Sequence, residues 1–160
     1  MIVLWSLVGA AAGTIVLSTA LRLASELQLT RMDMPFLVGT MVTDDREHAK
    51  RIGLGLHAVA GLSFGLVYAG IFAATGRSGW LLGAALGVLH GLVAGTAVVE
   101  TLVPFAHRRI GSPATSSPES PVLEPPGFLM LNYGRATPVV NAVAHAAYGA
   151  LVGGLASFAS

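Results

Sequence analysis

The sequence predicts an all-α polytopic membrane protein: an antiparallel bundle of four transmembrane helices with a short interfacial segment between the first two. Two observations predict this fold. Of the 160 residues, 54% are hydrophobic and only 11% are charged, whereas a soluble domain has about 25% charged residues. Four stretches are also long and apolar enough to cross a bilayer. This composition excludes a typical soluble enzyme and a disordered tail, and the net charge of +1 offers no general attraction for nucleic acid.

The four spans follow from the length that a bilayer requires. A hydrocarbon core about 30 Å thick needs about 20 mostly apolar helical residues, and a helix satisfies its own backbone hydrogen bonds in lipid. Glu100 is the only Asp, Glu, Lys or Arg inside the four stretches. We expect one membrane domain over residues 1–160, with spans at about 2–21, 52–74, 80–105 and 138–158.

The basic residues predict an orientation. Eight of the nine Lys and Arg residues lie in the two long connections, after the first and the third span, and only Arg77 lies in the short connection. Basic residues gather in cytoplasmic loops. We therefore expect the long connections in the cytoplasm, both termini outside it, and the chain in the inner (plasma) membrane of the cell.

The connection between the first two spans is not a plain linker. The apolar segment 35–41 is too short to cross the membrane and is expected at its interface. Asp44 with Glu47 three residues later is typical of a capping box, so the second long helix should begin in the cytoplasm. The short turn 75–79 then predicts an antiparallel hairpin of the second and third helices.

The second long connection has two parts. Residues 111–126 are rich in Ser and Pro and predict a flexible cytoplasmic loop. Residues 127–137 are apolar and should pack back onto the bundle. Pro138 occupies a position typical of the first turn of a helix, with Thr137 as its N-cap.

Small residues recur at helical spacing in all four spans. Lipid provides no hydrophobic drive for helices to associate, so small residues that let backbones approach are typical of helix contacts. These rows predict ordinary packing within the bundle; the alternative is a dimer face or a cofactor lying against glycine. The candidate packing residues are Gly83, Gly87, Gly91 and Gly95 in the third span, Gly61 in the second and Gly149 in the fourth.

Ionisable side chains inside a membrane are costly, and each is a hypothesis of function. Counting about 1.5 Å per residue, His57, Glu100 and His145 share one layer in the cytoplasmic half, with Asn141 nearby. The same count places His90 about 15 Å further out than Glu100.

Three interpretations of this polar layer stay open. His57 and His145 could ligate a haem iron or a transition metal, because imidazole suits both. His57, Glu100 and His145 could relay protons or bind a small polar ligand. The same side chains could form structural interhelical hydrogen bonds. No nucleotide loop, nucleophile elbow or zinc motif is present.

Several segments resemble a family of small bacterial integral membrane proteins of unknown function. The most specific segment is the run GFLMLNYGRATP at 127–138, followed by His145 and Gly149; others are MPFLVGTM at 34–41 and His90 with the glycine after it. The chain departs from the family pattern after the third span, where HRRI at 107–110 replaces His-Pro-Arg-Met. The resemblance implies a membrane protein and no particular chemistry.

The sequence thus predicts a non-enzymatic integral membrane protein, either an accessory or structural subunit of a larger membrane complex or a self-associating helix bundle. The expected partners are the lipid bilayer and a second membrane protein or a second copy of the chain. The alternatives are a haem- or metal-binding protein with His57 and His145 as ligands, and a proton or small-ligand path through the His57–Glu100–His145 layer.

Overall fold

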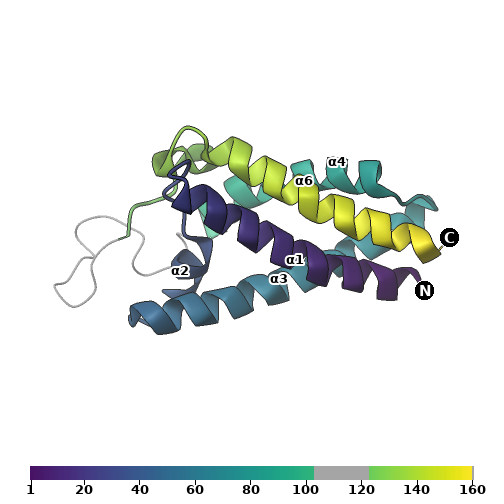
Figure 1. The fold of residues 1–160 in the computed structure, drawn as a ribbon, viewed down its shortest axis with the longest axis horizontal. Helices are drawn as coiled ribbons and strands as arrows, with labels where there is room; N and C mark the ends of the chain where they lie inside the picture. The colour runs from purple at the N-terminus through teal and green to yellow at the C-terminus, as the bar shows by residue number, and fades with distance from the viewer. Residues whose placement is uncertain (103–122, 160) are drawn as a thin grey trace.

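The structure, a computed structural model, describes residues 1–102 and 123–159, and the side chains of these residues except 100–102. Its long helices are α1 (Ile2–Glu26), α3 (Arg46–Thr75), α4 (Trp80–Val93) and α6 (Thr137–Ala156), which form an elongated bundle (Figure 1). Among the described residues, 4 helices are long and apolar enough to cross a membrane. The predicted four-helix membrane bundle is confirmed.

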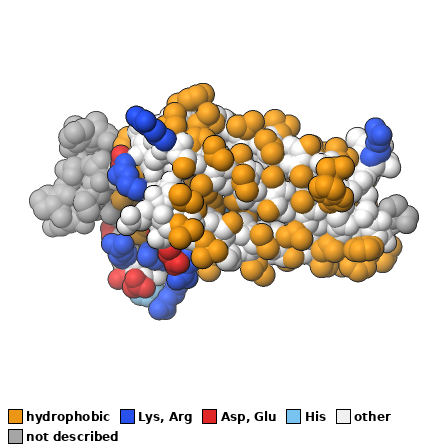
Figure 2. All heavy atoms as spheres, turned by 45° about the horizontal axis from the view of Figure 1, so that its top comes forward, with side chains coloured by type: hydrophobic (Ala, Val, Ile, Leu, Met, Phe, Trp, Pro, Cys, Tyr) orange, Lys and Arg blue, Asp and Glu red, His pale blue; other side chains and the backbone are white. Residues whose placement is uncertain are grey.

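Charge and apolar surface are separated along the bundle. Figure 2 shows apolar side chains over its middle, basic and acidic side chains together at one end, and an isolated basic side chain at the other. This distribution matches a body that sits in hydrocarbon with its polar end in water. Both termini lie at one end of the bundle (Figure 1), and the main charged cluster lies at the other end (Figure 2).

The helices are longer than the predicted spans at the charged end. Helix α1 continues past residue 21 to Glu26, and α3 already begins at Arg46. The third span changes character, since α4 ends at Val93 and continues as a π-helix, η1 (Ala94–Leu102). Helix α6 begins one residue before the predicted span and is followed by η4 (Ser157–Ala159).

The cap predicted for the second long helix is off by one residue. Asp45, not Asp44, is the N-cap of α3, and its Oδ1 accepts a hydrogen bond of 2.7 Å from the backbone N–H of His48. This bond favours the ionised carboxylate and holds the pKa of Asp45 below its usual value. Both residues suit a cap chemically, but Asp45 is the one that directly precedes the first helical residue, Arg46.

Thr137 is not the N-cap of α6, which is Ala136. The hydroxyl of Thr137 is instead 2.7 Å from the hydroxyl of Thr30, and both side chains are buried. The sequence pattern identified the start of the helix. It could not show that the Thr137 hydroxyl pairs with Thr30, 107 residues away in the chain, instead of capping the helix.

Two short elements close the charged end. Helix α2 (Met34–Gly39) lies between α1 and α3 and packs against α3, where Gly53 leaves no room for a Cβ beside the backbone of Pro35. The 3-10 helix η3 (Phe128–Tyr133) packs back onto the bundle, as predicted, with Met130 1% exposed. Burial raises the pKa of Tyr133 to about 12. The predicted loop 111–126 lies largely outside the described residues.

The order of helices around the bundle differs from the order along the chain. Helix α6 packs against both α1 and α4, and α1 packs against α3. The turn between α3 and α4 forms as expected, with Gly76 in the left-handed conformation that ends a helix (φ 63°). Its two helices nevertheless meet through side-chain rings rather than through close backbone contact.

Helices α4 and α6 approach backbone to backbone. An added Cβ at Gly83 would overlap the carbonyl of Gly149, and one at Gly87 would overlap the carbonyl of His145. Gly91 faces the side chains of His145 and Asn141. The glycine row of α4 therefore faces α6 of the same chain.

We expect Gly83→Ala to destabilise the protein by about 1–3 kcal/mol, because the added methyl forces the two backbones apart. Gly70→Ala is the matched control, since a Cβ there meets nothing within 4 Å, and should leave stability unchanged or raise it by about 0.5–1 kcal/mol, because alanine is the better helix former. Denaturant unfolding of the purified protein in detergent measures both. Equal effects of the two substitutions would contradict the proposed contact.

Candidate functional site

The polar side chains of α6 are held by backbone carbonyls at the centre of the bundle. Asn141 donates through Nδ2 to the carbonyl of Gly91 on α4 at 2.7 Å, and both of these residues are buried. The Nδ1 of His145 lies 2.9 Å from the carbonyl oxygen of Asn141. Because a carbonyl can only accept, Nδ1 of His145 carries the proton in this bond. The side chain of Asn141 therefore ties α6 to α4, and the ring of His145 is held in a fixed orientation by its own helix.

His90 belongs to the same centre, which corrects the depth estimate. Its ring centroid lies 4.8 Å from that of His145, with the planes at 78°. Counting residues from the predicted ends of the spans had separated His90 from the layer of His145 by about 15 Å. That separation is wrong, and the two histidines form an edge-to-face pair.

The register of α4 against α6 explains the error. The close contacts Gly83–Gly149, Gly87–His145 and Gly91–Asn141 step by four residues on each helix, in opposite directions. One further step of this register places Gly95 level with Thr137 at the start of α6. The prediction had assumed that the two spans end at the same depth.

Aromatic rings fill the wider space between α3, α4 and α6. The ring of His90 stacks on Phe64 of α3 with centroids 3.8 Å apart. Tyr148 of α6 lies edge-on to Tyr68 of α3 at 5.7 Å, and its hydroxyl donates to the carbonyl of Gly61 at 2.6 Å. Edge-to-face and stacked pairs of this kind stabilise aromatic clusters. Rings, rather than glycines, thus connect α3 to α4.

Two polar atoms of this aromatic cluster have no hydrogen-bond partner among the described residues. They are the hydroxyl of Tyr68 and Nδ1 of His90, and their ring centroids are 6.2 Å apart. An unpaired polar atom inside a protein costs free energy, and each one calls for an explanation. The hydroxyl of Ser6 on α1 is also buried without a described partner, but Tyr68 and His90 are the two that lie together in one cluster of rings.

His57 lies apart from this pair, on the face of α3 toward α1. Its Nδ1 is 3.2 Å from the hydroxyl of Ser18 on α1. Sequence reasoning identified His57 but not Ser18, because a lone serine in an apolar helix gives no distinguishing pattern. The two side chains join α1 to α3, and both are only partly buried.

The arrangement offers little to a metal or haem. Among the described residues no group of three or more His, Cys, Asp or Glu side chains could hold a metal ion. His145 packs against His90 and holds its own backbone, while His57 pairs with Ser18. Glu100 lies in η1, but its side chain falls outside the described residues.

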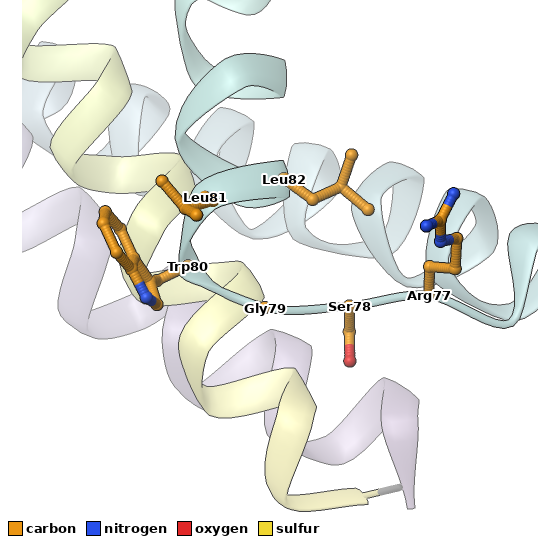
Figure 3. Close-up of a pocket in the computed structure, with 6 residues that line it drawn as sticks. All are labelled: Arg77, Ser78, Gly79, Trp80, Leu81 and Leu82. Carbon is orange, nitrogen blue, oxygen red and sulfur yellow. The ribbon is translucent and has the colours of Figure 1, made fainter.

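The surface hollows of the described structure include two that bear on function. One, of about 450 Å³, follows the turn between α3 and α4 and is lined by the consecutive residues 77–82 (Figure 3). Figure 3 shows the side chains of Arg77 and Trp80 at opposite ends of this turn, so no set of polar groups converges there. The other, of about 720 Å³, lies between α1, α2 and α3 and includes His57 and Ser18 in its lining.

Comparison of the chain with protein-family models, curated proteins and solved structures finds no match. The functional argument therefore rests on the residues and their geometry.

The two tyrosines of the aromatic cluster provide a matched test of this assignment. Tyr148→Phe removes the bond to Gly61 and should lower stability by about 0.6–2 kcal/mol. Tyr68→Phe removes a hydroxyl without a described partner and should leave stability unchanged or raise it. Unfolding in detergent, monitored by circular dichroism, measures both. A loss in Tyr68→Phe as large as in Tyr148→Phe would show that the Tyr68 hydroxyl has a bound partner.

Proposed function

We propose that this chain is a non-enzymatic integral membrane protein that acts as an accessory or structural subunit of a larger membrane assembly. One observation carries the proposal: three polar side chains at the bundle centre, those of Asn141, His145 and Tyr148, bond to backbone carbonyls of the bundle. Asn141 bonds to α4 and Tyr148 to α3. A reaction centre needs functional groups that face a substrate, whereas these groups hold the helices together.

The outer surface supports a role in assembly. In the most apolar 18-residue window of each span, the share of residues buried inside the chain is 33% for α1 and 28% for both α3 and the third span. The remaining residues are partly or fully exposed on the outer surface, where they can contact lipid or a neighbouring protein. The glycine rows of α4 and α6 are already used within the chain, so self-association would have to use larger apolar side chains on the outside.

A proton or small-ligand path is the second candidate, and one observation favours it. The hydroxyl of Tyr68 and Nδ1 of His90 are both buried without a described partner, which suits a chain of groups that exchange protons. This path differs from the predicted one, because it runs through His90 rather than through His57. Haem or metal ligation by His57 and His145 has no comparable support.

We also propose that the chain lies in the plasma membrane with both termini outside the cytoplasm. Six described basic residues lie at the charged end, and one, Arg77, lies at the other end. The six are Arg22, Arg31, Arg46, Lys50, Arg51 and Arg135. Arg77 lies at the end of the termini, since Gly79 two residues later donates from its backbone to Gly153 near the end of α6. Basic residues favour the cytoplasmic side.

Single cysteines test this orientation, because the chain has none of its own. A membrane-impermeant maleimide applied to intact cells should label Arg77→Cys, and should label Glu47→Cys only after permeabilisation. Both positions are exposed, and removing Arg77 only increases the charge asymmetry. Labelling of Glu47→Cys in intact cells would reverse the proposed orientation.

Purification from the native membrane in mild detergent tests the accessory role. We expect a colourless particle heavier than one 16.3 kDa chain, containing a second polypeptide at a fixed ratio. Light scattering, quantitative mass spectrometry and an absorption spectrum measure this. A particle of the single chain with a Soret band lost in His145→Ala would contradict it. Proton flux in liposomes that is abolished in His90→Phe, with folding retained, would favour the second candidate.

A further inference from the structure

A groove opens between α1, α2 and α3 at the charged end of the bundle. Toward the turn end, α1 and α3 are close, since a Cβ added at Gly61 would overlap Thr14. They separate toward the charged end, where α2 lies between them (Figure 1). The resulting hollow measures about 720 Å³ and is lined mostly by apolar atoms. The groove therefore begins at the charged end and continues, with mostly apolar walls, along the membrane-spanning part of α1 and α3.

The mouth of the groove carries both signs of charge in equal number. Arg22 of α1 pairs with Glu26 at 2.8 Å, and Lys50 of α3 lies 3.7 Å from Asp33 at the start of α2. All four residues line the groove. The side chains remain accessible, at 81% for Arg22 and 40% for Lys50. Cations of this kind bind phosphate, and the carboxylates can accept hydrogen bonds from an ammonium group.

A second polar level lies deeper in the groove. Ser18 precedes Arg22 by one turn of α1 and therefore lies about 6 Å further from the charged end. Its hydroxyl contacts the ring of His57 on α3. The Nε2 of His57 has no hydrogen bond to the described residues. Below this level the walls are mostly apolar, with Ile15 and Ala58 among them, and the hydroxyl of Thr14 donates to the carbonyl of Ala10 on its own helix. The polarity thus changes in three steps, from charged to neutral polar to apolar.

We propose that the groove binds one phospholipid molecule whose headgroup is zwitterionic. The phosphate lies between Arg22 and Lys50, and the ammonium lies near Glu26 and Asp33. The ester carbonyls lie at the level of Ser18 and His57, and an acyl chain follows the apolar wall. The equal balance of charge at the mouth selects a zwitterionic headgroup over an anionic one. This inference goes beyond the proposed accessory role and is independent of it.

Lipid retention in native mass spectrometry tests the proposal. The protein is incubated in detergent with equal amounts of phosphatidylethanolamine, phosphatidylcholine and phosphatidylglycerol. We expect the protein to retain one molecule of phosphatidylethanolamine. Its retention should be about tenfold higher than that of phosphatidylglycerol, which corresponds to a difference in binding free energy of about 1.4 kcal/mol. Its ammonium also donates hydrogen bonds that the choline group cannot, so phosphatidylcholine should be intermediate. Equal retention of the three lipids, or a preference for phosphatidylglycerol, would overturn the proposal.

Matched variants locate the binding to the groove. Arg22→Ala combined with Lys50→Ala should reduce retention at least fivefold, whereas Arg51→Ala, which removes an exposed charge outside the groove, should leave it unchanged. Ala58→Phe should block the apolar wall, and Ala60→Phe on the exposed face is its control. Thermal unfolding without added lipid checks that each variant is folded. An equal loss in a control and its groove variant would refute the assignment.

Discussion

The backbone contact between α4 and α6 is the constraint on which the rest of the bundle depends. In lipid, helices associate through close packing and interhelical hydrogen bonds rather than through the hydrophobic effect. Gly83 and Gly149 let the two backbones meet without intervening side chains. That distance allows Asn141 to reach the carbonyl of Gly91. The same register brings His90 beside His145, so one packing solution determines the polar centre.

Helix α3 is held by a different mechanism. It contacts α1 through small residues such as Gly61 and Gly65, but it meets α4 through the rings of Phe64 and His90. Aromatic rings are larger than glycine residues, so they keep α3 and α4 further apart. The bundle is therefore tight across α1, α6 and α4 and more open around α3. The groove at the charged end is part of this openness, because α2 and not a long helix fills the space between α1 and α3.

The described polar groups divide into two sets with different roles. At the centre, Asn141, His145 and Tyr148 bond to backbone carbonyls and leave few groups free for chemistry. At the charged end, Arg22 and Lys50 remain accessible beside carboxylates. The first set supports a structural role, and the second set faces the region where lipid headgroups meet water. The apolar sides between them are left for lipid and for partner helices.

The sequence by itself determined the four spans, the position of the short α2, the return of residues 127–137 onto the bundle and the uneven distribution of basic residues. These features depend on local composition and on the thickness of a bilayer, so they need no knowledge of neighbours. Only the tertiary structure decided that His90 meets His145 and that Thr137 bonds to Thr30 rather than capping α6. The position of each segment relative to its neighbours determines these two contacts. Counting residues along one helix cannot show how far the neighbouring helix is shifted along the bundle.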